Sequence, residues 1–107
     1  MRIRVTSPGM DIKQTEIDKI EKDLEKVDRR LSSYDEVEIL LRVKDHGSSS
    51  AHPKVHITME IDYGRNHLVA KADDDDMFVA VREARDDALR QINDRSRGGH
   101  SSFAKGT

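Results

Sequence analysis

The sequence contains no cysteine and few aromatic residues, which make up 4% of its 107 positions. The absence of cysteine excludes disulfides, thiolate metal sites and cysteine nucleophiles. Because proteins that bind single-stranded RNA stack bases on clustered aromatic rings, the low aromatic content argues against a base-stacking platform. The sequence also has no apolar run near the roughly 18 residues of a membrane span, and its N-terminus has no signal-peptide pattern. We therefore expect a cytoplasmic protein.

Charged residues are unusually abundant. They form 37% of the chain against 35% apolar residues, and 19 Lys and Arg oppose 21 Asp and Glu, for a net charge of -2. A chain of this length holds one domain with a modest core. Because the net charge is slightly negative, any attraction to nucleic acid depends on basic patches that are segregated from the acids.

Two hydrophobic periods alternate along the chain. Period-two patterns predict strands at 2–5, 37–43 and 55–61, and a turn at 63–66 predicts a fourth strand that pairs back on the third. Apolar residues three and four apart predict one helix from Thr15 to Leu31 and another from Met77 to Ile92. The order β-α-β-β-β-α predicts an α+β fold, with a four-stranded mixed sheet and two helices packed on one face.

The hairpin formed by the last two predicted strands has a specific register. With its turn at 63–66, Ile61 faces Leu68 and Met59 faces Ala70. Both apolar pairs lie on the same face of the hairpin. We expect this face beneath the helices, with His56 on the opposite, open face of the sheet.

The last part of the sequence, SRGGHSSFAKGT, differs in composition from the rest. It is rich in Gly and Ser and polar overall, which is typical of flexible segments. We therefore expect a domain of residues 1–95, followed by a flexible C-terminal tail of residues 96–107.

Four consecutive aspartates, Asp73–Asp76, precede the second predicted helix. Carboxylates there accept hydrogen bonds from free N–H groups and interact favourably with the helix dipole, for about 0.3–1 kcal/mol each. At the first helix, Thr15 and Asp18 resemble a capping box. A divalent-cation site is the alternative for the aspartate run, but the run lacks the turn glycine and spaced ligands of a calcium loop. We expect capping without metal, and no other cofactor.

Lysines and arginines are grouped on both predicted helices. At about 100° per residue, the first helix separates an apolar, an acidic and a basic stripe, and the arginines of the second helix fall within one outward arc. The candidate phosphate-binding residues are Lys22, Lys26, Arg29, Arg30, Arg82, Arg85 and Arg90. Such a strip is typical of proteins that bind nucleic-acid phosphates. The alternative is two solvated helix faces stabilised by weak ion pairs.

The sequence lacks the common catalytic motifs. There is no Gly-x-Ser-x-Gly elbow, Walker loop or dinucleotide glycine pattern, although Ser, His and Asp all occur. We identify no catalytic residues and expect a binding protein, not an enzyme.

The segment DDMFVAVREARDDALRQI at residues 75–92 resembles the signature of the ribosome hibernation-promoting factors, also called ribosome-associated inhibitors or sigma-factor modulation proteins. The matching positions are Asp76, Met77, Phe78, Ala80, Val81, Asp86, Arg90, Gln91 and Ile92. The N-terminal stretch IRVTSPGMDI is similar to the family's first strand and turn, and the family has the same β-α-β-β-β-α order. The resemblance covers roughly residues 1–95.

The resemblance implies a small cytoplasmic protein that binds the small ribosomal subunit in the channel used by tRNA and mRNA, through basic helix side chains on ribosomal RNA phosphates. Such a protein represses translation when growth stops and protects idle ribosomes. Lys26 and Arg90 match basic positions of the family, whereas the other candidates come from the stripe pattern alone. The chain resembles the short family form, without a dimerising C-terminal domain. We expect a monomer off the ribosome, with no membrane partner and no small-molecule substrate.

Several charged positions depart from the family pattern. Asp23, Asp87 and Asp94 stand where lysine is common, and Arg82 replaces the usual aspartate. These reversals favour an alternative, a divergent member that acts as a protein-interaction module without ribosome binding, through its mixed-charge helices or an open sheet edge.

Overall fold

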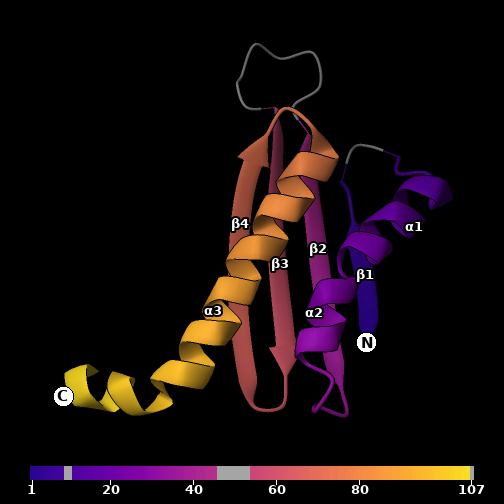
Figure 1. Cartoon of the computed structure of the whole chain (residues 1–107). Coiled ribbons are helices and arrows are strands. Elements are labelled where there is room, and N and C mark those ends of the chain that lie inside the picture. Colours follow the sequence, from indigo (N-terminus) through magenta and orange to yellow (C-terminus); the bar gives the residue numbers. More distant parts are fainter. Residues whose placement is uncertain (9–10, 46–53, 107) are drawn as a thin grey trace.

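The protein has two layers, a four-stranded sheet and a layer of helices that covers one face of it (Figure 1). The computed structural model describes residues 1–8, 11–45 and 54–106, with only the backbone described for 97–106. The elements are β1 (Arg2–Thr6), α1 (Gln14–Asp23), α2 (Glu25–Arg30), β2 (Val37–Asp45), β3 (Val55–Tyr63), β4 (Asn66–Asp74) and α3 (Met77–Gly106). This arrangement confirms the predicted α+β fold, with the first predicted helix divided into α1 and α2.

The strands lie in the order β1-β2-β3-β4. β1 pairs with β2 in parallel, because the chain between them crosses the sheet through α1 and α2, and the two remaining pairs are antiparallel. In the last pair Ile61 lies opposite Leu68 and Met59 opposite Ala70, so the predicted register is confirmed. His56 lies on the alternate face of β3, outside the buried core, and hydrogen bonds Asp73 across the strands.

The core lies between the two layers. Alternate residues of the strands and one stripe of each helix fill it, as the hydrophobic periods predict. The fully buried large side chains are Ile20, Leu24, Val27, Leu31, Ile39, Leu41, Val43, Ile57, Met59, Ile61, Leu68 and Val81. Burying each such side chain stabilises the fold by about 1.5–3 kcal/mol. These residues hold the helices at fixed positions over the sheet, and that fixes where the helices' outward side chains lie.

The first helix begins earlier than the sequence predicts and is interrupted. Its N-cap is Lys13, whose backbone N–H donates to the Oε1 atom of Glu16 at 2.9 Å. The predicted capping box of Thr15 and Asp18 is therefore wrong, because Thr15 already lies within the first turn of α1. The helix is interrupted at Leu24, where φ is -86° and ψ is -1°, and resumes as α2.

The four aspartates divide between a strand and a helix start. Asp76 caps α3, because its Oδ1 accepts hydrogen bonds from the backbone N–H of Phe78 at 2.8 Å and of Val79 at 3.2 Å. The other carboxylates bond elsewhere: Asp73 with His56, Asp74 with the N–H of Asp76, and Asp75 with the N–H of Lys54. The capping prediction is thus confirmed for Asp76, whereas Asp73 and Asp74 belong to β4.

The last helix is longer than predicted. Two of its side chains donate to outward carbonyls of the edge strand β4: Gln91 Nε2 to Val69 at 2.9 Å and Arg95 Nη1 to His67 at 2.8 Å. Beyond these contacts α3 continues to Gly106 and extends away from the sheet (Figure 1). The sequence did not indicate a helix here, because glycine at an interior position costs a helix about 1 kcal/mol relative to alanine. The domain limit at residue 95 and the flexibility of residues 96–107 stay predictions.

Candidate nucleic-acid interface

The α1–α2 pair and α3 meet along one line on the outer side of the helix layer. Lys19, Asp23, Lys26 and Arg30 recur three and four residues apart, so they share one side of α1 and α2. We call this line, together with the α3 residues that it meets, the helix seam. Its α3 residues are Phe78, Arg82 and Asn93.

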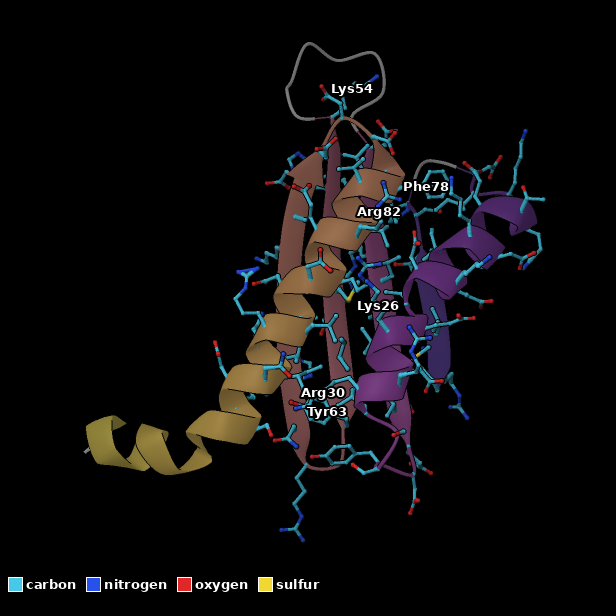
Figure 2. The ribbon with its side chains drawn as sticks, in the orientation of Figure 1. Lys26, Arg30, Lys54, Tyr63, Phe78 and Arg82 are labelled. Carbon is cyan, nitrogen blue, oxygen red and sulfur yellow. The ribbon has the colours of Figure 1, made fainter. Side chains whose placement is uncertain are left out.

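Three contacts fasten the seam along its length. The Lys19 Nζ atom lies 4.2 Å from the centre of the Phe78 ring, a cation–π contact. Arg82 Nη1 lies 3.7 Å from Asp23 Oδ2, and Arg30 Nε donates to Asn93 Oδ1 at 2.8 Å. Figure 2 shows Arg82, Lys26 and Arg30 following one another along this line. The structure therefore brings together three of the predicted candidates, Lys26, Arg30 and Arg82.

Lys22 and Arg29 lie next to the seam on the outward side of α1 and α2. Both are exposed, and Arg29 makes an ion pair with Glu25 across one helical turn, at 4.0 Å. The helical period places the acidic stripe, which includes Glu21, Glu25 and Asp28, on the side away from α3. The basic stripe of this helix thus faces α3, and the acidic stripe faces away from it.

Arg85 is not at the surface where the stripe pattern put it. The residue is only 8% exposed, and Nη2 of its guanidinium lies 2.9 Å from Asp86 Oδ1. Its Nη1 donates to the backbone carbonyl of Asp23 at 3.3 Å, at the point where α1 ends and the helical hydrogen bonds are interrupted. The expectation of an outward Arg85 is therefore wrong, because a long side chain beside the core stripe reaches beneath the neighbouring helix. Arg85 holds the two sides of the seam together.

Arg90 lies on a different side of α3. It pairs with Asp87 at 3.8 Å, and the Asp87 Oδ2 atom accepts a hydrogen bond from Gln91, which also reaches β4. This side of α3 faces the β4 edge. The two family-matched positions, Lys26 and Arg90, are thus not neighbours, although both are exposed.

The cations differ in how they are paired. Among the residues that the structure describes, Lys22, Lys26 and Arg30 have no carboxylate within ion-pair distance, whereas Arg29, Arg82 and Arg90 each have one. Those three pairs are partly or fully exposed, and exposed ion pairs contribute only about 0–1 kcal/mol. Lys19 likewise has no carboxylate partner among these residues, but its ammonium lies over the Phe78 ring, so Lys26 and Arg30 are the seam cations whose charge is most available to an anionic partner.

Sequence reasoning did not select Lys19 and Arg95 as site residues. Lys19 belongs to the basic stripe and lies seven positions before Lys26, so the helical period alone could have placed it on the seam. Arg95 falls at the edge of the segment read as a tail, and its position became clear only from its hydrogen bond to the His67 carbonyl. In the same way, no local pattern showed that Arg95 and Arg30 lie at the same end of the helix layer.

A second charged region lies at the end of the sheet beside the β3–β4 turn. A hollow of about 620 Å³ is lined by Tyr34, Asp35, Glu36, Glu38, Asp62 and Gly64, among other residues. We call it the acidic corner. Its four carboxylates repel phosphate, so this end of the sheet does not attract a polyanion.

Two further observations limit the chemistry of the described residues. Across ranges 1–8, 11–45 and 54–96 no three His, Asp or Glu side chains come together in a way that could hold a metal ion. Nor does any described helix have the length and apolarity needed to cross a membrane.

Comparisons with known proteins identify relatives of this fold. The chain is similar to the N-terminal domain of Thermus thermophilus Protein Y, with a TM-score of 0.71 and 19% identity over 86% of this chain and 96% of that chain. It is also similar to a ribosomal subunit interface protein from Coxiella burnetii, with a TM-score of 0.70 and 18% identity over 91% of this chain and 99% of that chain. No curated protein sequence matches.

These similarities to solved structures establish the fold, and a comparison with sequence-family profiles identifies the family. The profile described as sigma 54 modulation protein / S30EA ribosomal protein matches residues 3–97, which is almost the whole chain. The chain therefore belongs to the sigma 54 modulation protein / S30EA ribosomal protein family.

Proposed function

We propose that this protein is a ribosome-associated hibernation factor that binds the small ribosomal subunit through the helix seam and represses translation by occluding the tRNA and mRNA channel. Membership of the family supports association with the ribosome, and with it a cytoplasmic location. The observation that carries the finer proposal is the pair of seam cations, Lys26 and Arg30, which have no carboxylate partner among the described residues.

The geometry of the seam suits a phosphate backbone. Lys26 and Arg30 are one helical turn apart, which is about 6 Å along the axis. The guanidinium of Arg30 donates in a fixed fork that matches phosphate oxygens, and Lys26 adds a point charge beside it. Arg82 is partly exposed and lies 3.7 Å from Asp23 without a hydrogen bond to it, so its guanidinium keeps donors for a phosphate. With Lys19 over the Phe78 ring, the seam thus offers four cations to a strand of ribosomal RNA that runs along it.

In this proposal the protein acts by occupying space. It binds as a monomer and performs no chemistry, and its inhibition of translation follows from the volume that it fills in the channel. The phosphate contacts provide affinity without base recognition, so binding depends strongly on salt.

The alternative, a protein-interaction module, is favoured by the acidic corner and by the neutralisation of Arg82 by Asp23. A partner protein with a basic segment would bind the acidic corner and leave Lys26 and Arg30 unused. The two proposals differ in the surface that is occupied, so matched charge reversals separate them.

The test is co-sedimentation of the purified protein with small ribosomal subunits over a range of salt concentrations. The double variant Lys26→Glu/Arg30→Glu should weaken binding at least about a hundredfold, because each charge-assisted hydrogen bond contributes about 1.5–3 kcal/mol. Each lost phosphate contact should also flatten the slope of log affinity against log salt by about 0.7–0.9. A cell-free translation reaction that the native protein inhibits should recover with the variant.

The matched control is Arg42→Glu/Lys71→Glu, which makes the same change of charge on the open face of the sheet. Both residues are exposed, and each lies opposite Thr58 in the sheet. This control should bind nearly as well as the native protein. Equal loss in both variants would mean that the attraction is spread over the whole surface, and undiminished binding by the folded seam variant would contradict the proposal.

A further inference from the structure

At the lower end of the helix seam, where α2 ends and the β3–β4 turn lies beneath α3, the surface forms a hollow of about 240 Å³. The residues that matter for its chemistry are Arg30, Tyr34, Tyr63, Asn66 and Arg95. Figure 2 shows Arg30 and Tyr63 next to each other at this end of the molecule. We call it the basic hollow, and it shares Arg30 with the seam.

Two guanidinium groups line the basic hollow from different helices. Arg30 is oriented by its hydrogen bond to Asn93 at 2.8 Å, and Arg95 by its hydrogen bond to the His67 carbonyl at 2.8 Å. Both of these partners are neutral groups, an amide oxygen and a backbone carbonyl. A guanidinium has five N–H donors, so each arginine keeps donors for a ligand while one contact holds it in position. Two such groups at one hollow favour a doubly charged anion such as a phosphate monoester.

An aromatic side chain lies beside these arginines. Tyr34 packs edge-on against Tyr63, with ring centres 5.1 Å apart and an angle of 80° between the rings. Tyr63 is only 3% exposed, whereas Tyr34 is 39% exposed and presents part of its ring to the hollow. Gly64 allows this packing, because a Cβ atom at that position would lie 3.0 Å from the Tyr34 ring. The turn thus holds an accessible aromatic ring in one place.

We propose that the basic hollow binds one unstacked nucleotide, with its phosphate between Arg30 and Arg95 and its base against the ring of Tyr34. The volume is below the roughly 300–1,000 Å³ of sites for drug-sized molecules, which suits one nucleotide unit and no more. Phosphate and base together explain why two cations and an aromatic ring lie at the same hollow, whereas a phosphate alone needs no ring. A single position of this kind is compatible with the low aromatic content, which excludes only an extended stacking surface.

The source of the nucleotide follows from Arg30, which belongs to both the seam and the hollow. A ribosomal RNA strand on the seam would place one of its unpaired nucleotides at the hollow. This assignment to ribosomal RNA rests on the proposed function, but nucleotide binding itself does not. The acidic corner on the other side of Tyr34 repels phosphate, so the strand approaches from the seam side.

The test is a titration of the isotope-labelled protein, without ribosomes, with adenosine and uridine 5′-monophosphates, followed by NMR. Amide signals of Tyr34, Asn66 and Arg95 should shift together. Ribose 5-phosphate and the free nucleosides should each bind about tenfold more weakly, because each lacks either the stacked base or the charged group. Ribose 5-phosphate binding as well as the nucleotides would overturn the proposal, and so would the absence of any shift at these amides.

Variants test the two parts of the ligand. Tyr34→Leu should reduce nucleotide affinity to the level of ribose 5-phosphate, and Arg95→Gln to the level of the nucleoside. The matched control is Arg65→Gln, which removes an exposed arginine from the same hairpin turn and should leave affinity unchanged. Circular dichroism and melting temperature establish that each variant is folded. If Tyr34→Leu is unfolded, the Arg95→Gln comparison alone decides, and native affinity in that variant would overturn the phosphate assignment.

A cross-linking experiment decides whether the bound nucleotide belongs to ribosomal RNA. A photoreactive phenylalanine analogue at position 34 should join to one nucleotide of small-subunit ribosomal RNA in the complex. Nucleotide binding in solution without this cross-link would overturn the ribosomal source and leave a site for a free nucleotide. If the native protein binds no nucleotide but still sediments with small subunits, this inference is rejected and the seam proposal stands. The two failures are therefore distinguishable.

Discussion

The basic hollow and the acidic corner lie on either side of one side chain. Tyr34 lines both, with Arg30 and Arg95 on one side and Asp35, Glu36 and two further carboxylates on the other. The loop from α2 to β2 therefore separates two surfaces of opposite charge. A net charge of -2 for the whole chain hides this separation.

The comparison shows how a slightly acidic protein can present a surface for a polyanion. Attraction over distances of about 10 Å depends on the local arrangement of charge, since salt screens more distant charges. Carboxylates near the seam are either paired with a cation or held on the far side of the helix. Two of the three acids that depart from the family pattern fit this account, because Asp23 and Asp87 pair with Arg82 and Arg90. Four predictions test the comparison, from the largest expected effect to the smallest.

The largest effect is expected at Arg30, which belongs to the seam and the basic hollow together. Arg30→Glu alone should lower affinity for small ribosomal subunits at least about tenfold, because it removes charge-assisted hydrogen bonds and adds repulsion. Affinity is measured by co-sedimentation, with Arg65→Glu on the other side of the turn as the control for charge. Equal losses in the two variants would mean that the basic hollow has no special role.

The second effect concerns Arg85, which lies beneath the helix seam. Arg85→Met keeps much of the buried side-chain volume but removes the donor to the Asp23 carbonyl, so the free energy of unfolding should fall by about 1–3 kcal/mol. Thermal unfolding should then shift down by several degrees, since each kcal/mol corresponds to about 4–8 °C in a small domain. The control Arg82→Met removes a partly exposed ion pair that has no hydrogen bond, and should cost less than Arg85→Met. Similar losses in both would show that Arg85 does not join the helices.

The third effect separates stability from surface charge. Asp76 caps α3, which starts at the end of the sheet opposite the β3–β4 turn (Figure 1). Asp76→Ala should reduce the free energy of unfolding by about 1 kcal/mol, and Asp76→Asn by much less, because Asn also caps well. Neither variant should change ribosome affinity at a temperature where both are folded. If ribosome affinity fell in parallel with stability in these variants, the loss of affinity in Arg30→Glu would also have to be corrected for its loss of stability.

The smallest effect is expected from the acidic corner itself. Asp35→Asn with Glu36→Gln removes two exposed carboxylates beside the basic hollow. Affinity for small subunits should rise by about threefold at low salt and by less at high salt, because exposed charges are screened. Reduced affinity in this variant would indicate that the acidic corner makes its own contact, as the protein-interaction alternative requires.

Several residues of the family signature have roles in the fold, which is why the signature could predict the architecture. Asp76 caps α3, Ala80, Val81 and Ile92 lie in the core, and Gln91 fastens α3 to the edge of β4. These roles maintain the fold. The signature therefore identifies the architecture directly, whereas Lys26 and Arg30, which carry the proposed RNA contact, lie outside it.

The sequence by itself determined the elements, their order and the hairpin register. Strand side chains alternate with period two and helical ones recur at 3.6, so the positions of buried residues such as Ile61 and Leu68 follow from local spacing. The basic stripe of α1 and α2 could be located in the same way. The start of α1 was misplaced, because Lys13 is not a typical N-cap residue.

Only the tertiary structure decided which charges act together. A helical period gives the direction of a side chain relative to its own helix, but not the neighbour that it meets. Arg85 was therefore assigned to the surface although it lies beneath α1 and α2, and Arg90 was grouped with Lys26 although it lies beside Asp87. Tyr34 and Arg95, far apart in the chain, meet at one hollow because the packing of α3 across the sheet brings its last core turn to the β3–β4 turn.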